Sequence, residues 1–559
     1  MPLPAWNRVN LKPAHPDKVK RILENLSNSK SFGFDNIDTF CLKLVKDEIT
    51  PAITHIINLS IMQNRFPESW KKSKIIPLYK KDYPLNPKNY RPVAILPILS
   101  KVLERVVFCQ ITEYLQTNKL LHPSSHAYRK GHNTSTALIS MYDIWTRSVD
   151  SGQSTAAIVL DMSAAFDIID RKLLLEKLKL MGFQGNVVEW LDSYLNNRTQ
   201  SVCVNGALSK LLPTDTGVPQ GSILGPLLYS LYTLELPEVI NETSQNKEEN
   251  TVLHPWYHVG ADRFDNIIVY ADDTTVNLAA ATDAELSEKL ENTFRVLSEY
   301  MVSQGLKLND EKSHLLCFIC SKSRTEGGIN TVLKTNLGDI KPSDSEKFLG
   351  GIVHKDLKWT NHILKDKDNL VSALNRRCNA LKSVSRVASF KTRKTIANGL
   401  FMGKLSYLIC VWGGTSEENL RALQVAQNKA AKFVTRNWKG GTIDNLRAIG
   451  WLSVRQLVFY HTAVLMFKIK RGISCTEHIA PEYLMKMFNW EYVYSTRQAD
   501  RELVKPIGIP RLEVTRQGFR YRAADTFNLL PEEIRQVLSL ETFKAKAKEW
   551  IKTNIGAKA

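Results

Sequence analysis

The chain has 559 residues, of which 43% are hydrophobic and 23% are charged, a balance typical of a folded protein and not of a disordered one. This length exceeds that of one compact core and predicts about three or four folding units. The net charge of +19 favours a polyanionic partner. Since no apolar run is long enough for a membrane span and the N-terminus lacks secretory features, we expect an intracellular protein, nuclear or cytoplasmic, that is neither secreted nor membrane-bound.

The N-terminal part of the chain favours helices. The helical pattern runs from about residue 17 to 64 and is interrupted at Gly33, which predicts a turn. Residues 74–79 have the composition of a strand. The following stretch, 83–92, contains three prolines, so we expect an irregular connection there. A helix is predicted next, because apolar residues recur at helical spacing from Ile98 onward.

A buried strand is predicted over residues 156–160 and ends at Asp161. The pattern then predicts a leucine-rich helix over 171–181, a turn over 217–222 and an apolar helix over 223–232.

The chain becomes polar between residues 235 and 265, which predicts a surface excursion. Two apolar strands are predicted after it, over 266–270 and 275–278. The acidic pair Asp272 and Asp273 would then lie at the tip of a hairpin.

The last part of the chain reads as almost wholly helical. An amphipathic helix is predicted over 283–304, and the pattern from Trp359 to Asn437 is helical throughout. Residues 361–440 hold 15 Lys and Arg residues against four Asp and Glu residues, a net charge of +11. Such a surface is either a solvated helical face or a groove that follows phosphates. We expect a hinge at residues 440–441 and then a final helical region.

The eight cysteines show no framework spacing, which favours reduced thiols. Cys317 and Cys320 have zinc-like spacing, but they lie in an apolar, strand-like run without a second Cys or His pair. A structural zinc needs four such ligands, so we do not expect a zinc site here.

Three carboxylates carry the candidate chemistry. Nucleotidyl transfer requires two divalent ions about 4 Å apart, held by carboxylates. Asp161 at the end of a strand, with Asp272 and Asp273 at a neighbouring hairpin tip, would supply such a site. An isolated Asp-Asp pair is more often only a polar turn.

Three sequence blocks indicate the function of these carboxylates. Residues 161–167 read DMSAAFD, residues 217–226 read GVPQGSILGP and residues 270–274 read YADDT. In this order and spacing the blocks resemble the reverse transcriptases of non-long-terminal-repeat retrotransposons, the LINE-like and jockey-like elements. The resemblance extends from about residue 31 to the C-terminal end.

The resemblance implies an α+β right-hand polymerase with fingers, a palm built on an antiparallel sheet, and a helical thumb. We expect an N-terminal helical extension over residues 1–60, fingers and palm over 61–358 and a basic thumb over 359–438. Residues 439–559 would form a helical C-terminal region to which no role is assigned.

The resemblance also implies the catalytic residues. Asp161, Asp272 and Asp273 correspond to the catalytic triad that binds two Mg²⁺ ions, with Mn²⁺ as the alternative ion. Phe166 corresponds to the gate that excludes a ribose 2′-hydroxyl, although it would also serve as a core phenylalanine. Gln220 and Gly221 correspond to residues along the templating base and incoming nucleotide, or else form only a turn.

Basic residues of the same family blocks would bind phosphates. Lys312 and Arg91 are candidates for binding the nucleotide, and Lys312 is also a candidate general acid. Arg129 and Lys130 are candidates for binding the template. Ordinary surface charge is the competing interpretation for each of them.

A further block, Phe348, Leu349 and Gly350, resembles the hairpin that grips the primer in this family. The expected partners are therefore an RNA template, a DNA primer or target, and deoxynucleoside triphosphates.

Some parts expected of such elements are missing from the sequence. There is no endonuclease-like region, no ordered set of carboxylates for RNase H after Gly440 and no Cys-His knuckle. We therefore expect a polymerase module from a truncated or separately encoded element. His126 and His132 depart from the family pattern and weaken the template-binding assignment. The alternative is a non-catalytic nucleic-acid-binding protein derived from such a polymerase, although all three carboxylates are present.

Overall fold

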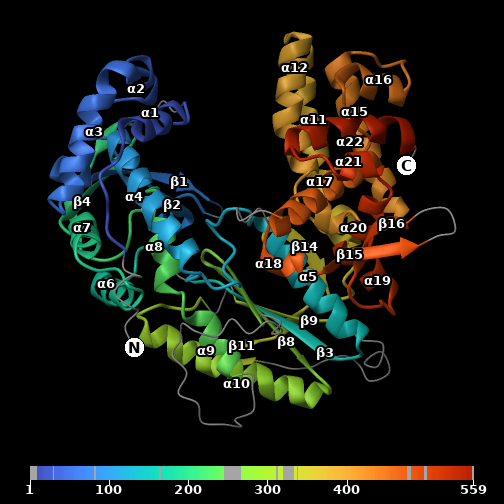
Figure 1. The fold of residues 1–559 in the computed structure, drawn as a ribbon, viewed down its shortest axis with the longest axis horizontal. Coiled ribbons are helices and arrows are strands. Elements are labelled where there is room, and N and C mark those ends of the chain that lie inside the picture. Colours follow the sequence, from blue (N-terminus) through green and yellow to red (C-terminus); the bar gives the residue numbers. More distant parts are fainter. Residues whose placement is uncertain are drawn as a thin grey trace. The chain divides into compact units, whose positions relative to one another are not determined.

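The computed structural model describes residues 9–28, 31–80, 83–162, 165–243, 266–309, 313–318, 333–335, 338–474, 480–495 and 500–556. The chain forms two compact units (Figure 1). The first unit comprises Met1–Tyr128, Met162–Arg263 and Arg295–Asn309. The second unit comprises Arg129–Asp161, Phe264–Phe294 and Asp310–Ala559.

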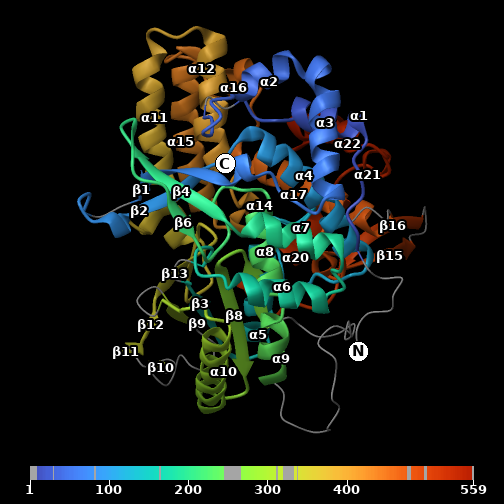
Figure 2. The same ribbon diagram turned by 90° about the vertical axis from the view of Figure 1, so that its left-hand side faces the viewer.

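The first unit combines helices with a five-stranded sheet (Figure 2). Its helices are α1 (Pro16–Glu24), α2 (Thr39–Leu44), α3 (Lys46–Met62), α4 (Ile98–Thr117), α6 (Arg171–Leu180), α7 (Asn186–Leu195), α8 (Leu224–Tyr232) and α9 (Leu236–Thr243), with 3₁₀ turns η2 (Glu68–Lys71) and η3 (Pro87–Asn89). Its strands are β1 (Lys72–Tyr79), β2 (Tyr90–Ile95), β4 (Arg198–Val204), β5 (Ala207–Leu208) and β6 (Leu212–Thr214). They run in the order β2-β1-β4-β5, and β6 also pairs with β4.

One strand of this sheet corrects an expectation. The irregular connection predicted over 83–92 ends earlier than expected, because β2 begins at Tyr90 and includes Pro92. Among the described strands, β2 pairs with β1 alone and stands at the edge of the sheet. Proline lacks the N–H that a second neighbour would need, so an edge strand is where a sheet accepts it.

The second unit is built on a sheet with the order β12-β9-β3-β8-β7. Its strands are β12 (Pro342–Ser343), β9 (His314–Phe318), β3 (Ser154–Leu160), β8 (Asp273–Ala280) and β7 (Ile267–Tyr270). The central strand β3 is antiparallel to both β8 and β9 and is almost fully buried. This burial explains its continuous apolar sequence. Three two-stranded hairpins complete the strands: β10 (Leu333–Thr335) with β11 (Gly338–Ile340), β13 (Ser345–Phe348) with β14 (Gly351–His354), and β15 (Phe488–Ser495) with β16 (Asp500–Pro506).

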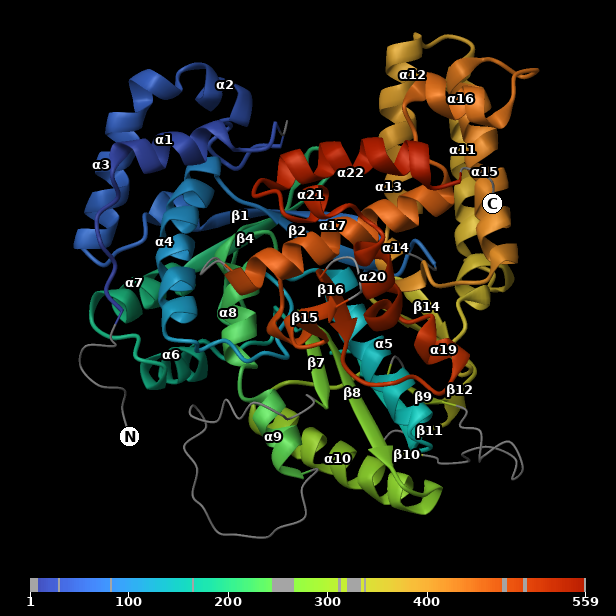
Figure 3. The ribbon, with the colours of Figure 1, turned by 45° about the vertical axis from the view of Figure 1, so that its right-hand side comes forward.

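Helices form most of the second unit (Figure 3). They are α5 (Thr134–Asp150), α11 (Leu370–Ser385), α12 (Phe390–Ala397), α13 (Gly403–Leu405), α14 (Ile409–Trp412), α15 (Glu417–Thr435), α16 (Thr442–Ile449), α17 (Val454–Ser474), α18 (Glu482–Met485), α19 (Glu513–Arg516), α20 (Phe519–Asn528), α21 (Glu532–Arg535) and α22 (Leu540–Asn554), with π-helical turns η6 (Asn361–Lys365) and η7 (Asn398–Met402). The helical pattern predicted from Trp359 onward is confirmed. α10 (Asp283–Ser303), also predicted, has residues in both units.

The C-terminal region is not wholly helical, contrary to expectation, because it contains the β15–β16 hairpin. Val493 and the aromatic residues around it favour a strand, and pairing with residues 500–506 satisfies their backbone groups. Among the helices that the structure describes, none is long and apolar enough to cross a membrane.

Candidate active site

The β7–β8 hairpin and the end of β3 bring together the backbones of two predicted ligands. Leu160 pairs with Thr274, and Tyr270 pairs with Asp273 across a two-residue loop. Asp161 follows directly after Leu160, so Asp161 and Asp273 end neighbouring strands at the same edge of the sheet. Asp272 lies in the loop itself. The predicted hairpin is confirmed, but β8 begins at Asp273, two residues earlier than expected.

The loop of this hairpin is strained at Ala271. This residue has φ of +59°, in the left-handed region that glycine favours, and its side chain is buried. An alanine there costs roughly 1–2 kcal/mol relative to a relaxed backbone. Strain of this kind persists where the surrounding structure enforces it and is common at functional sites.

The carboxylates fit a magnesium ion in chemistry, because Mg²⁺ prefers hard oxygen ligands. Among the described residues, no three His, Cys, Asp or Glu side chains are gathered closely enough to hold a metal ion. The strand register therefore brings the backbones together, while the side chains do not form a closed ligand set. Three like charges repel one another, and a bound cation would offset that repulsion.

In the first unit, Phe166 packs against a buried aromatic ring. Its ring centroid lies 4.9 Å from that of Tyr229, which is fully buried on α8. The Tyr229 hydroxyl lies 2.8 Å from the Met162 sulfur and donates to it. Phe166 itself remains partly exposed. One face of its ring is thus fixed by packing while part of the side chain is accessible.

Gln220 and Gly221 lie beside β2 of the first unit. The Ala94 N–H donates to the Gln220 carbonyl at 2.8 Å, and the Gln220 amide Nε2 donates to Asp167 Oδ2 at 2.8 Å. Gly221 has φ of +118°, and a Cβ added there would lie 2.6 Å from the Ala94 carbonyl oxygen. In this structure the close approach that requires glycine is to the chain's own backbone.

A residue that the sequence did not single out, Arg171, holds this turn in place. Its guanidinium donates to three backbone carbonyls, those of Thr214, Thr216 and Gly217, at 2.7–2.9 Å. Burial lowers the pKa of Arg171 to about 10. The separation of more than 40 positions between donor and acceptors explains why no local pattern revealed the contact.

The predicted phosphate-binding residues lie in different places. Arg91 is exposed on β2 of the first unit, opposite Leu78. Lys130 is exposed in the second unit, whereas Arg129 is partly buried, and burial lowers its pKa while Glu482 acts in the opposite direction. Lys312 lies outside the described residues.

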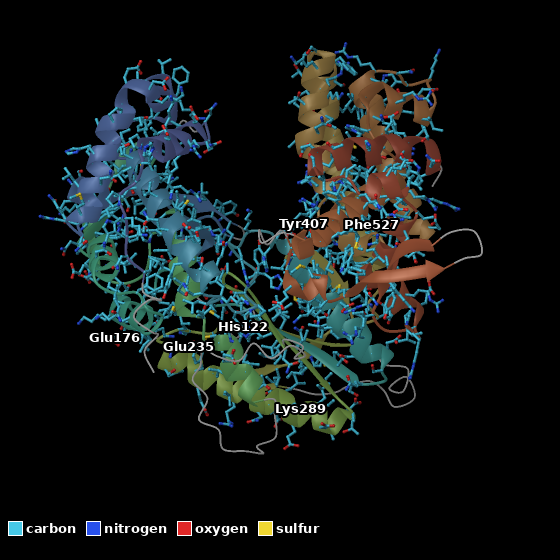
Figure 4. The ribbon with its side chains drawn as sticks, in the orientation of Figure 1. His122, Glu176, Glu235, Lys289, Tyr407 and Phe527 are labelled. Atoms are coloured by element: carbon cyan, nitrogen blue, oxygen red, sulfur yellow. The ribbon has the colours of Figure 1, made fainter. Side chains whose placement is uncertain are left out.

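The predicted primer-binding hairpin is the β13–β14 turn of the second unit. Phe348 is buried, with its ring centroid 4.8 Å from that of Trp145. Leu349 and Gly350 form the two-residue loop and are partly exposed. The hydroxyl of Tyr407, labelled in Figure 4, donates to the Leu349 carbonyl at 2.6 Å. The loop, and not the Phe348 ring, is therefore the part of this hairpin that a ligand can reach.

Cations surround this hairpin. The Lys404 ammonium lies 5.6 Å from the centre of the Tyr407 ring. Burial lowers the pKa of Lys404, and the charges of Arg377 and Lys347 lower it further. Among the described residues, no carboxylate contributes to the shift of the Lys404 pKa. A half-buried cation without an acidic partner is well placed to bind an anion.

Cys317 is a buried free thiol on β9, and burial raises its pKa to about 12. A thiol held in this protonated form is a poor metal ligand. Its predicted neighbour Cys320 lies outside the described residues.

Comparison with known proteins identifies the family that this region matches. Residues 78–353 match the family "Reverse transcriptase (RNA-dependent DNA polymerase)", and this match contains all three carboxylates. This part of the chain, about half of its length, therefore belongs to the reverse transcriptase family. Enzymes of this family use divalent metal ions in general.

Similar proteins come from mobile elements of Drosophila melanogaster. The probable RNA-directed DNA polymerase from transposon X-element is 25% identical over 76% of this chain and 44% of its own length. The corresponding protein from transposon BS is 25% identical over 83% of this chain and 49% of its own length. The RNA-directed DNA polymerase from mobile element jockey is 24% identical over 75% and 43%. The chain thus spans about half the length of the curated relatives it matches.

Proposed function

We propose that the chain is an RNA-directed DNA polymerase of a non-long-terminal-repeat retrotransposon, which extends a DNA primer on an RNA template. The observation that carries this proposal is the position of Asp161 and Asp273 at one edge of a sheet, with Asp272 in the adjoining loop, in a chain of the reverse transcriptase family. Such a protein would act inside the cell, where both RNA template and DNA target are found.

We further propose the right-hand arrangement of this class. The sheet around β3 would be the palm, residues from 61 onward would supply the fingers, and the basic helices over 359–438 would be the thumb. The net charge of +11 in residues 361–440 supports a nucleic-acid-binding role for that segment. The first 60 residues would form an N-terminal extension.

Two Mg²⁺ ions bound by Asp161, Asp272 and Asp273 would activate the primer 3′-hydroxyl and stabilise the departing pyrophosphate. Phe166 would place its accessible edge against the sugar of the incoming nucleotide and exclude a 2′-hydroxyl. Packing against Tyr229 fixes that ring, which a steric gate requires. Gln220 would contact the nucleotide through an amide already oriented by Asp167.

Basic residues would bind the polyanionic substrates. Arg91 and Lys312 are proposed for the triphosphate, and Arg129 and Lys130 for the template. The Leu349–Gly350 loop, with Lys404 close to the Tyr407 ring that holds it, is proposed for the primer strand. Phe348 would support that loop from the core.

Primer extension tests the proposal. Purified full-length chain is given an RNA template with an annealed DNA primer, Mg²⁺ and deoxynucleotides, beside the variants Asp272→Asn and Asp368→Asn. Asp368 is an exposed carboxylate of the second unit and serves as the matched control. We expect extension by the wild-type chain and the control, and none by Asp272→Asn.

Two other outcomes contradict parts of this proposal. If the wild-type chain binds template-primer but never extends it, the non-catalytic alternative holds. If Asp272→Asn extends as well as wild type, the assignment of the carboxylates fails. A Phe166→Ala variant that incorporates no more ribonucleotides than wild type would remove the gate assignment alone.

A further inference from the structure

One face of α5 is packed against the sheet that carries the candidate metal ligands. The Trp145 indole Nε1 donates to Asn277 Oδ1 on β8 at 2.6 Å. The same ring packs against Phe318 of β9 and Phe348 of β13, with ring centroids 5.0 and 4.8 Å apart. Asn277 is four residues from Asp273 on the same strand. The position of α5 therefore bears directly on the position of β8.

The neighbouring face of α5 is held by the C-terminal region. Asp143, Thr146 and Asp150 lie at positions i, i+3 and i+7, which share one helix face. The Thr515 hydroxyl donates to the Thr146 carbonyl, and the backbone N–H groups of residues 511 and 512 donate to the Asp150 carboxylate at 2.6–3.0 Å. Figure 3 shows α19 and α20 beside α5.

The centre of this contact is a buried ion pair. Arg520 of α20 donates from Nε and Nη2 to the two carboxylate oxygens of Asp143, at 2.8 and 2.6 Å. Both side chains are less than a tenth exposed. The Tyr483 hydroxyl donates to the same carboxylate at 2.7 Å, and Arg520 Nη1 also donates to the carbonyl of Met487. The hydrogen-bonding groups of the pair are thus well satisfied.

A buried pair of this kind is a weak means of stabilising a protein, since apolar residues of similar size often do as well. The two parallel hydrogen bonds restrict the relative orientation of the two side chains, because a guanidinium and a carboxylate pair in one plane. The pair therefore fixes the orientation of α5 more narrowly than apolar packing would.

We infer that Arg520 is a positioning residue for nucleotidyl transfer: through Asp143 it sets α5 against β3 and β8, at whose ends the candidate metal ligands lie. This inference rests on the proposed function. It gives Arg520 of the C-terminal region a role in the reaction, although this residue lies outside the sequence blocks that contain the carboxylates. It also implies that Tyr483 acts together with Arg520, since both hold the same carboxylate.

Three variants test the inference. Arg520→Met removes the charge and keeps the volume, Arg520→Lys keeps the charge without the paired geometry, and Asp143→Leu with Arg520→Met replaces the whole pair by apolar side chains. Arg516→Ala is the matched control, because Arg516 forms an exposed ion pair with Glu513 in the same region. Each variant is compared with wild type in primer extension and in amide hydrogen exchange.

We expect Arg520→Met to lower kcat by about 10- to 100-fold, since small displacements of reacting groups cost that much. The KM for template-primer should remain near the wild-type value. Arg520→Lys should recover part of the activity, while the apolar double variant should fold and remain slow. Exchange should rise over residues 273–278 and stay at the wild-type level in α22.

The inference is overturned if the folded Arg520→Met chain has wild-type kcat, or if the apolar double variant restores it, because the pair would then serve stability alone. It is also overturned if exchange over 273–278 does not change. The exchange measurement needs no polymerase activity, so a wild-type chain that fails to extend primers would contradict the proposed function without deciding the effect of Arg520 on β8.

Discussion

Two hairpins of the second unit, β7–β8 and β13–β14, have loops of the same length but differ in what holds their tips. Each has a two-residue loop with a non-glycine residue in the left-handed region, Ala271 at φ +59° and Leu349 at φ +47°. In β13–β14 the second loop residue is Gly350, at φ +84°, which relaxes the turn. In β7–β8 that position is occupied by Asp272.

The surroundings of the two loops also differ, because contacts support the β13–β14 loop more than the β7–β8 loop. The β13–β14 loop accepts a hydrogen bond from Tyr407 and stands on the buried Phe348 ring. The β7–β8 loop combines a strained alanine with two adjacent carboxylates. A loop optimised for stability would not place like charges beside backbone strain. The comparison teaches that the β13–β14 tip is held by packing and a hydrogen bond, whereas the proposed metal binding by Asp272 and Asp273 would account for the β7–β8 tip.

The largest expected effect is a loss of activity when a carboxylate at the β7–β8 tip is removed, compared with no loss near the β13–β14 tip. Asp273→Asn should lower kcat on the order of 10³-fold, because losing a metal ligand removes several kcal/mol of transition-state stabilisation. The Tm should not fall, since a repulsive charge is removed. Asp344→Asn, an exposed carboxylate just before β13, is the control and should leave kcat unchanged. A loss of Tm with intact kcat in Asp273→Asn would show that Asp273 serves stability and not activity.

The second effect concerns the pH dependence of stability near β13–β14. His362 is buried, and its Nδ1 accepts from the Ile352 N–H of β14. Burial lowers its pKa to about 4, with Lys404 and Lys347 acting in the same direction and Asp366 against it. Between pH 6.5 and 4 the unfolded chain binds a proton at this imidazole that the folded protein does not.

Stability should therefore fall as pH decreases through that window, by up to about 3 kcal/mol from this group. The free energy of unfolding is measured by urea denaturation at several pH values. His362→Asn keeps an acceptor near the Ile352 N–H and should lack this part of the slope. An unchanged slope in the variant would assign the acid sensitivity to other groups.

The third effect compares the loops directly. Gly350→Ala should destabilise the chain by about 1–2 kcal/mol, because an alanine at this φ is strained and its Cβ would lie 3.2 Å from the Tyr407 ring. Ala271→Gly removes similar strain but increases the entropy of the unfolded chain, so its net effect should stay within about 1 kcal/mol. Thermal unfolding of both variants measures the difference. Equal losses of Tm would remove the distinction between the tips.

The smallest effect is expected at the anchor of β13–β14. Tyr407→Phe removes the hydrogen bond to the Leu349 carbonyl and should cost about 1 kcal/mol of stability. If this loop binds the primer strand, the KM for template-primer should rise while kcat changes little. Steady-state kinetics checks this, and a fall in kcat alone would contradict a primer-binding role for the loop.

The sequence was sufficient to predict the strands that carry the carboxylates. Residues 156–160 of β3 and 267–269 of β7 are continuous apolar runs, as is typical of buried strands, and Asp161 follows β3 directly. The start of β8 was missed because residues 271–274 were all assigned to the loop, whereas Asp273 and Thr274 pair with Tyr270 and Val269 and leave a tight turn at Ala271. Only tertiary contacts force it into the left-handed region, and no local pattern reports them.

Contacts between distant positions could not be predicted at all. Arg171 holds carbonyls more than 40 positions away, and Arg520 pairs with a carboxylate 377 positions away. The β15–β16 hairpin was missed for a different reason, because one strand-like run among many helices does not reveal its partner. Its alternating aromatic residues around Val493 were a usable signal.

The Asp143–Arg520 pair also has a consequence for synthesis of the chain. α5 leaves the ribosome 377 residues before Arg520 does, an interval of roughly 20–75 s at 5–20 residues per second. During that time Asp143 lacks the Arg520 guanidinium, and the helix face that packs against the C-terminal region is exposed. We therefore expect the sheet that carries the carboxylates to reach its final packing only after nearly the whole chain has been made.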